Sequence, residues 1–371
     1  MDLQQLTAQL SEEIGRTATL VGADTPGESE SHRLAIPIRN SAGPVAYFEL
    51  ADVGGAPLSS ADYGLIDAAA SLARDLMDDA DADRTGSSRD WAMSRLLSDD
   101  LAVRRAAFVE AVTHRWLDRG PRTVLRAVLL DDAVGRLQRV AFGRHLAATT
   151  HSRTTFVREQ DGVVFLVTRD SGVDVDVDGA IRIEGVRFGV PVVSIGSAPH
   201  DPASPDLADA AEQARVAADL TAALPELQPA SSIGDLGGWV LLHSVAPGAR
   251  RLGDISPAAE QLCRDGDNLQ RQTIETYLDA GGQARAACEL LHIHRTTLYY
   301  RLDTMPEVVR DALADGLKRS TLHLSLKLLR LWNDVPTASE RSSASSRRRR
   351  VPETRAVAPV RQLHPQSAGT E

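Results

Sequence analysis

Two adjacent glycines, Gly281 and Gly282, interrupt a helical pattern that otherwise runs from Leu269 to Met305. Between Leu269 and Leu278, apolar residues recur at intervals of three and four, the spacing of one face of an α-helix. Glycine readily adopts the positive φ that a helix end needs, so the pair stops this first helix. The chain is therefore expected to form a helix, a sharp turn and a second helix here, and few local folds have this arrangement.

The residues after the glycine pair predict two further helices. Segment 284–291 is rich in alanine, whose small side chain lets a second helix cross close to its neighbours at a steep angle. Residues 292–294 predict a tight turn, and a third helix is expected to begin at about Arg295. At about 100° per residue, Leu298 and Leu302 share one face of that helix, which we expect to pack in the core.

The opposite face of the third helix carries polar and aromatic side chains. Helix-turn-helix proteins place such a face in the major groove of DNA, with the residues at its N-terminal end nearest the base edges. The residues expected to read bases are Arg295, Thr296, Thr297 and Tyr299. Those expected on phosphates are Arg285, His294 and Arg301, and Tyr300 completes the exposed surface. The predicted partner is double-stranded DNA.

Three other interpretations of this segment stay open from the sequence. Spacing alone also fits a helical hairpin inside a protein core, with its polar residues in water. Tyr299 and Tyr300 could form a buried pair. His292 and His294 could bind a metal, although no cysteine or carboxylate lies nearby at ligand spacing, so we expect neither a metal nor a cofactor.

Charge is distributed unevenly along the chain. The net charge of the 371 residues is −10, which by itself disfavours a nucleic-acid ligand. Residues 281–332, however, carry eight Lys or Arg against five Asp or Glu, and residues 336–371 carry seven Arg against three Glu. Because attraction to phosphates depends on the local field, a mildly basic C-terminal third on an acidic body is compatible with DNA binding.

Breaks in the pattern divide the chain into blocks, since its length exceeds the usual size of one core. We expect, in order, an N-terminal α+β module at 1–80, a linker at 81–90, a middle domain at 91–230, a connector at 231–268, an all-helical domain at 269–332 and a disordered Ser- and Arg-rich tail at 333–371. The connector is expected to carry a short strand and a short helix.

Within these blocks, apolar runs and helical spacing predict individual elements. Strands are expected at 18–21, 34–38 and 45–50, then at 123–130, 154–159, 162–169 and 187–197, with a hairpin around Asp161-Gly162. Helices are expected from an N-cap at Ser59 or Ser60, and at 91–97, 104–116, 135–150 and 207–220. The alternation predicts a sheet covered by helices, so the fold class is α+β and multidomain.

Two features bear on location. No run of eighteen or more apolar residues is long enough to span a bilayer. The first residues lack the basic and apolar parts of a secretory signal. We therefore expect a cytoplasmic protein with no membrane partner.

The run TYLDAGGQARAACELLHIHRTTLYYRL, residues 276–302, resembles the C-terminal domain of the PucR family of transcription regulators, also called CdaR-like. That domain is marked by YLxxGGN…AAxxLxxHRNTLxYRL, and residues 320–332 resemble its closing helix. The resemblance implies activation or repression controlled by upstream domains. Thr297 stands where the family usually has Asn, Tyr299 stands where a basic residue is common, and Asp303 puts a negative charge near the phosphates.

The upstream blocks resemble the same family more weakly. Residues 1–80 are similar to the latter part of a GAF sensor domain, especially at 33–53 and in the helix that follows, which implies a small-molecule effector. The middle domain matches the order of elements in a GGDEF-like domain, but residues 159–170 lack the Gly-Gly-Asp/Glu-Glu-Phe run that holds metal and nucleotide. We expect no cyclase and, without a Walker loop, GxSxG or HExxH motif, no other enzyme.

The sequence thus predicts a regulator that forms a homodimer or larger homo-oligomer, places two recognition helices in successive major grooves, and recruits or blocks RNA polymerase. Asp303 favours the alternative, a sensor or protein-interaction scaffold whose helix-turn-helix no longer binds DNA specifically. The arginine-rich tail either adds nonspecific phosphate contacts or is simply a solvated end.

Overall fold

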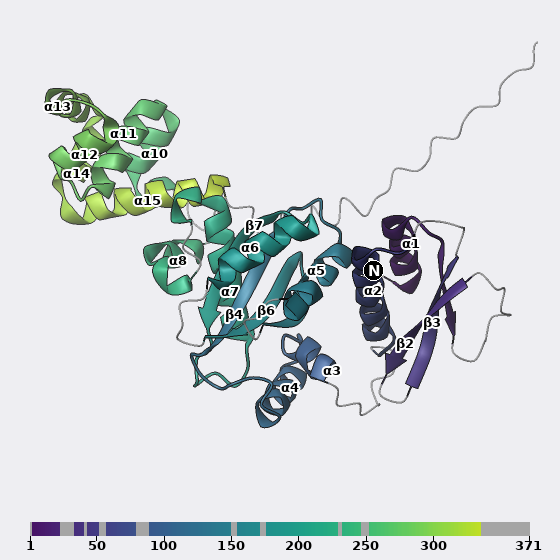
Figure 1. Cartoon of the computed structure of the whole chain (residues 1–371). Coiled ribbons are helices and arrows are strands. Elements are labelled where there is room, and N and C mark those ends of the chain that lie inside the picture. Colours follow the sequence, from purple (N-terminus) through teal and green to yellow (C-terminus); the bar gives the residue numbers. More distant parts are fainter. Residues whose placement is uncertain are drawn as a thin grey trace, which may run out of the picture. The chain divides into compact units, whose positions relative to one another are not determined.

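The computed structural model describes residues 2–22, 33–40, 43–51, 57–78, 89–149, 154–170, 176–228, 232–245 and 252–334. In these ranges the chain is a mixed α+β protein, as expected (Figure 1). Residues 79–88 of the linker region and the tail from residue 335 lie outside the described ranges, so the disorder of the tail stays a prediction. Among the described residues, no helix is both long and apolar enough to cross a membrane.

The N-terminal module is a three-stranded antiparallel sheet with two helices. Its elements are α1 (Leu3–Ile14), β1 (Ala18–Gly22), β2 (Arg33–Asn40), β3 (Gly43–Ala51) and α2 (Ser60–Asp78), and the strand order is β1-β3-β2. The three predicted strands are confirmed. Phe48 and Leu50 of β3 are buried in one cluster with Leu6 of α1 and Ile66 of α2, so both helices pack on the same face of the sheet (Figure 1).

A four-stranded antiparallel sheet forms the centre of the middle region. Its strands are β4 (Thr123–Leu130), β5 (Thr155–Gln160), β6 (Val163–Arg169) and β7 (Val192–Pro199), in the order β5-β6-β4-β7. The predicted hairpin joins β5 to β6 through Asp161 and Gly162. Both turn residues have positive φ, 52° and 85°, which matches the two-residue turn that suits the right-handed twist of the strands.

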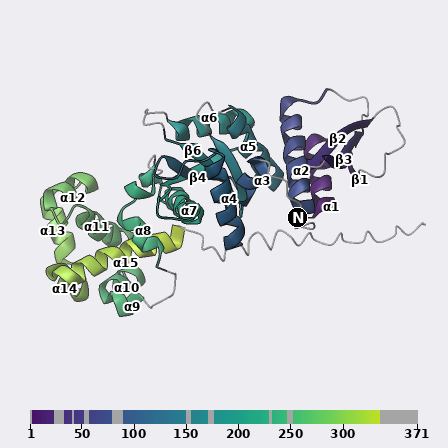
Figure 2. The same cartoon turned by 90° about the horizontal axis from the view of Figure 1, so that it is seen from below.

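Helices cover both faces of this sheet (Figure 2). On one face, α4 (Leu101–Thr113) and α7 (Ala208–Ala223) pack in a cluster with Phe165 of β6. On the other face, α5 (Arg136–Thr149) and α6 (Val177–Phe188) pack in a cluster with Val164 and Leu166. Neighbouring residues of β6 thus point to opposite faces, and six of its seven residues are buried.

Helix α6 and the start of β7 differ from the sequence expectation, which had one strand over 187–197. Arg187 and Phe188 instead end α6, and Gly189, with φ of 73°, closes the helix three residues before β7 begins. The ring of Phe188 lies 5.7 Å from that of Phe142, centroid to centroid. Because the helix end and the strand start both carry apolar side chains, hydrophobic periodicity does not separate them.

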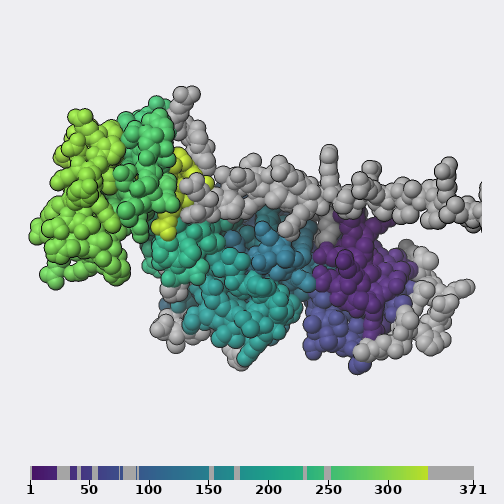
Figure 3. Space-filling model, turned by 90° about the horizontal axis from the view of Figure 1, so that it is seen from above, coloured from purple at the N-terminus to yellow at the C-terminus, as the bar shows by residue number. Residues whose placement is uncertain are grey.

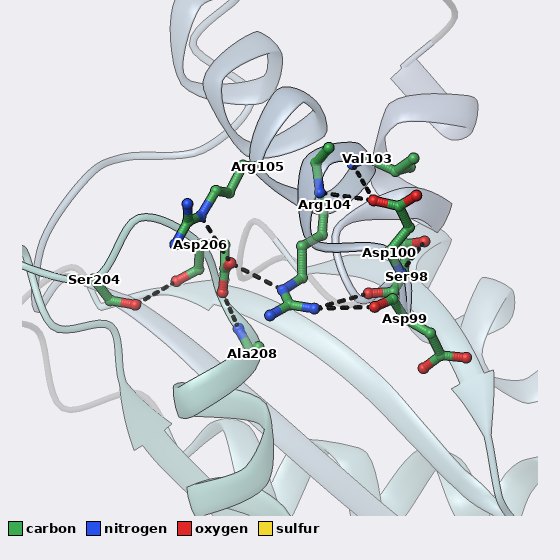
Figure 4. Close-up of polar contacts among 10 residues, drawn as sticks. Ser98, Asp99, Asp100, Val103, Arg104, Arg105, Ser204, Asp206 and Ala208 are labelled. Carbon is green, nitrogen blue, oxygen red and sulfur yellow. Dashed lines mark hydrogen bonds and ion pairs between the residues drawn. The ribbon is translucent and has the colours of Figure 1, made fainter.

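A part-buried ion pair joins α4 to the start of α7 (Figure 4). Arg104 donates from Nε to Oδ2 of Asp206 at 2.9 Å, and from Nη1 to the backbone oxygens of Ser98 and Asp99. The Asp206 carboxylate also accepts from the backbone N–H of Ala208 at 2.9 Å. Helix α4 begins at Leu101, three residues before the predicted start, after the short helix α3 (Arg89–Arg95).

Candidate nucleic-acid interface

The C-terminal helices form a continuous group of residues (Figure 3), and all of them except the helix at 284–291 contribute side chains to one hydrophobic core. They are α9 (Leu252–Ile255), α10 (Pro257–Arg264), α11 (Asn268–Asp279), α12 (Ala284–Leu291), α13 (Arg295–Asp303), α14 (Glu307–Ala314) and α15 (Gly316–Asp334). Leu262 of α10 is fully buried in the same cluster as Ile274, Val309 and Leu322. Helix α10 therefore supports the helices that follow it, although the sequence had suggested only a connector there.

The described part of residues 231–268 is largely helical. The 3-10 helix Ile233–Asp235, then α8 (Gly238–His243), α9 and α10, occupy most of it. In place of the expected short strand, this part has a single isolated bridge between Ser232 and Ser197.

The glycine pair ends α11 as predicted. Gly281 and Gly282 have φ of 63° and 76°, in the left-handed region. The N–H of Gly281 donates to the oxygen of Leu278, and that of Gly282 donates to the oxygen of Tyr277, both at 2.9 Å. These bonds satisfy carbonyl groups at the end of α11 and let the chain turn sharply into α12.

The turn between α12 and α13 places two histidines in different roles. His292 closes α12 with φ of 54° and ψ of 41°, a left-handed conformation that most non-glycine residues avoid. Ile293 donates from its N–H to the oxygen of Cys288 at 3.1 Å. His294 is the N-cap of α13, and its ring Nδ1 accepts from the backbone N–H of Thr296. Both histidines therefore shape the turn.

Helix α13 presents the predicted faces. Leu298 is fully buried, Met305 just beyond the helix is buried in the core cluster, and Leu302 packs against that cluster. Tyr299 and Tyr300 are 42% and 70% exposed, so the alternative of a buried tyrosine pair is wrong. The other residues exposed on or beside this surface are His294, Arg295, Thr296, Thr297 and Asp303. The N-terminal half of α13 is thus a polar surface open to a partner.

Arg295 is folded back along its own helix. Its Nε and Nη2 donate to the hydroxyl oxygen of Tyr299 at 3.2 and 2.9 Å, and its guanidinium carbon lies 5.2 Å from the centroid of the Tyr299 ring. The hydrogen bond to Tyr299 raises the pKa of the Arg295 guanidinium. The side chain remains fully charged at physiological pH and retains N–H donors for a ligand.

The two remaining arginines of the predicted set differ in their surroundings. Arg285 on α12 is 93% exposed, and its Nε pairs with Oε1 of Glu289 at 3.0 Å. Arg301 on α13 is half-buried, and its Nη1 donates to Oγ1 of Thr273 on α11 at 3.1 Å. An exposed ion pair exchanges readily with water or a ligand, whereas the bond from Arg301 braces α13 against α11.

Helix α15 carries a polar cluster that sequence reasoning did not identify. Lys327 pairs through Nζ with Glu275 at 2.7 Å and with Asp279 at 2.8 Å, and His323 lies 2.7 Å from Asp279. Burial raises the pKa of Asp279, but the hydrogen bonds from Lys327 and His323 outweigh it, so the net shift is downward. The cluster ties α15 to α11. The helical periodicity of α15 marks its core face, and nothing in the sequence pairs Lys327 with residues about fifty positions away.

The two histidines of the turn, His292 and His294, were one possible metal site in the sequence. Within the described ranges, no group of three or more His, Cys, Asp or Glu residues is arranged to hold an ion. The rings of His292 and His294 are both exposed, and His294 is engaged in capping α13.

One of three comparisons with known proteins matches these helices directly. The model of the PucR C-terminal helix-turn-helix domain matches residues 270–328. No curated protein sequence matches the chain. Among solved structures, the Regulator of Polyketide Synthase Expression from Bifidobacterium adolescentis is 15% identical, with a TM-score of 0.28, and the match covers 69% of this chain and 98% of that chain.

Proposed function

Because residues 270–328 are a PucR-type helix-turn-helix domain, we propose that this protein is a transcription regulator that reads the DNA major groove with α13. The observation that carries the proposal is the division of α13 into a buried face, at Leu298, and an exposed N-terminal face. A helix of this kind meets base edges with its first residues. The proposed base-reading residues are Arg295, Thr296, Thr297 and Tyr299.

The remaining residues of the predicted DNA-binding set are proposed to contact the phosphate backbone of the DNA. Arg285, which is highly exposed on α12, is proposed to contact a phosphate after exchanging its bond with Glu289. His294 at the start of α13 and Arg301 near its end are proposed to contact phosphates, Arg301 after exchanging its bond with Thr273, and Tyr300 is proposed to pack beside them. Asp303 repels phosphates, so we propose that the DNA backbone passes away from the C-terminal end of α13.

A single helix-turn-helix makes few base contacts. We propose that two copies of the chain bind together, so that their recognition helices lie about one DNA turn apart in successive major grooves. Binding at a promoter then recruits or blocks RNA polymerase. The N-terminal module is proposed to act as a GAF-like sensor of a small-molecule effector, and the middle domain as a GGDEF-like domain without cyclase activity. The turn Gln160-Asp161-Gly162 in its β5–β6 hairpin lacks the acidic pair that such chemistry needs.

The test is DNA binding by the full chain, measured by mobility shift on DNA upstream of its own coding region and by genome-wide binding. The double variant Arg295→Ala, Thr297→Ala is expected to lose specific affinity by about tenfold or more, because a bidentate arginine contact contributes strongly to discrimination between bases. Arg264→Ala is the matched control, since Arg264 is a largely exposed arginine on α10, away from α13.

Two outcomes would contradict the proposal. Wild-type protein that binds all DNA equally, and only at low salt, would support the scaffold alternative instead. A double variant that binds its sites as well as the Arg264→Ala control would remove α13 as the reading element.

A further inference from the structure

An arginine-rich cleft of about 640 Å³ lies between α2, α3, α5 and β5, remote in sequence from the DNA-binding helices. Six arginines line it, together with the acids Asp67, Asp99 and Glu159, so the lining carries three more positive than negative charges. The volume falls within the range of small-molecule sites, about 300–1,000 Å³. Such a surplus of charge favours a ligand with negative charge.

Two of these arginines are already paired with carboxylates. Arg144 on α5 donates from Nη1 to Asp67 on α2 at 2.6 Å, and from Nη2 to Ser71 Oγ at 2.5 Å. Arg136 donates from Nε to Glu159 at 2.8 Å. These pairs hold the cleft walls and use two of its three acids.

Three other arginines of the cleft each donate to a neutral acceptor. Arg74 donates to the hydroxyl of Ser71, Arg89 to the hydroxyl of Thr155, and Arg158 to the backbone oxygen of Leu97, each from one nitrogen. A guanidinium has five N–H donors in a planar fork, so each of the three retains donors that match the oxygens of a phosphate. The serine and threonine hydroxyls of the lining add further donors.

We propose that this cleft binds an organic phosphate carrying two or three negative charges. That charge matches the surplus of the lining, and the flat, forked donors of Arg74, Arg89 and Arg158 suit tetrahedral oxyanion groups. The ligand contacts α2 on one side and α5 and β5 on the other, so its binding adds a bridge beside the Arg144–Asp67 pair. This inference rests on the proposed function only in naming the class of effector that such a regulator would sense.

The experiment titrates inorganic pyrophosphate into the full chain by isothermal calorimetry at about 0.15 M salt, where weak surface attraction is screened. We expect one saturable site per chain. Arg144→Gln is expected to weaken binding by about tenfold or more, because it removes a positive charge from the lining and the pair with Asp67 that holds the cleft wall. Arg215→Gln is the matched control: Arg215 is 26% exposed against 24% for Arg144, and it also pairs with a carboxylate, Glu212, but lies on α7 outside the cleft.

A second variant guards against loss of folding. Arg89 is exposed and donates to the hydroxyl of Thr155, so Arg89→Gln is expected to leave the melting temperature unchanged while weakening pyrophosphate binding about fivefold or more. Binding that is absent in the wild type, or that weakens equally in Arg215→Gln, would overturn the site. Citrate at the same charge is expected to bind more weakly. Equal affinity for citrate would overturn the assignment to a phosphate.

The outcome is distinguishable from that of the proposed function. DNA binding of Arg89→Gln without pyrophosphate is expected to equal that of the wild type, because Arg89 lies far in the sequence from α13 and outside its core. A chain that binds pyrophosphate but not DNA would support the proposed phosphate site and contradict the proposed function as a transcription regulator. A chain that binds DNA but not pyrophosphate would contradict only the proposed phosphate site.

Discussion

Arg295 and Tyr299 are joined on one turn of α13, where both Nε and Nη2 of the arginine donate to the tyrosine hydroxyl. The guanidinium also lies over the tyrosine ring. The pair holds the arginine along the helix surface, so a base contact requires these two hydrogen bonds to be exchanged for bonds to the base. Tyr299 thus sets the position of the Arg295 side chain on the exposed face of α13.

Tyr299→Phe is expected to raise the affinity of the protein for its specific DNA by about two- to fivefold. The variant keeps the ring, through which Tyr299 is proposed to contact a base, but removes the hydroxyl acceptor, so Arg295 no longer gives up hydrogen bonds when it binds a base. Fluorescence anisotropy with a labelled operator measures the change. A loss of affinity would show instead that the Tyr299 hydroxyl itself contacts DNA. Tyr63→Phe, at an exposed tyrosine on α2, is the control and is expected to have no effect.

His292→Gly is expected to raise the free energy of unfolding by about 1 kcal/mol. His292 closes α12 in the left-handed region, where a Cβ is unfavourable and glycine is not strained. Urea denaturation followed by circular dichroism measures the difference. His292→Ala keeps the Cβ and is expected to give no gain. If the glycine variant were the less stable one, the imidazole would have to make a stabilising interaction of its own.

Asp206→Asn is expected to lower the free energy of unfolding by about 2–3 kcal/mol. The change removes the charge that compensates Arg104 while the arginine stays largely buried, and it weakens the hydrogen bond to Ala208. Glu212→Gln is the comparison, because it breaks an ion pair whose carboxylate is 63% exposed. It is expected to lower the free energy of unfolding by no more than about 0.5 kcal/mol. Chemical denaturation compares the two, and equal effects would argue against a structural role for the part-buried pair.

His200 is expected to make stability fall as the pH is lowered below about 6.5. Its ring is buried against Phe108, and within the described ranges neither ring nitrogen has a hydrogen-bond partner. Burial, with a smaller contribution from Arg119, lowers the pKa of His200 in the folded state. The unfolded chain therefore takes up a proton at a pH where the folded chain does not, and stability is lost as the pH falls from about 6.5 towards the folded pKa.

Denaturation at several values between pH 5 and pH 7.5 measures this slope, whose upper limit for one group is about 1.4 kcal/mol per pH unit. His200→Leu removes the titrating ring and is expected to flatten the slope. His114→Leu, at an exposed histidine, serves as the control. An unchanged slope in His200→Leu would assign the acid sensitivity to other groups.

The sequence by itself determined where most helices and strands of the C-terminal region and the sheets begin and end, because these ends depend on neighbouring residues. The glycine pair, the alanine-rich α12 and the start of α13 at Arg295 follow from helix caps and apolar spacing. Ser59 likewise caps α2 with Asp62, whose backbone N–H donates to the serine hydroxyl at 3.2 Å. The hairpin at Asp161-Gly162 follows from its turn residues. In each case the deciding interactions lie within about four residues of one another.

Only the tertiary structure decided which distant residues meet. The break between α6 and β7, the pairing of Lys327 with Glu275 and Asp279, and the arginine-lined cleft between α2 and α5 all depend on contacts across many residues of chain. The same holds for Gly196 of β7, where an added Cβ would collide with the backbone oxygen of Ala214 on α7. Periodicity identifies the face that an element buries, but the partner of that face follows from the packing of the whole chain.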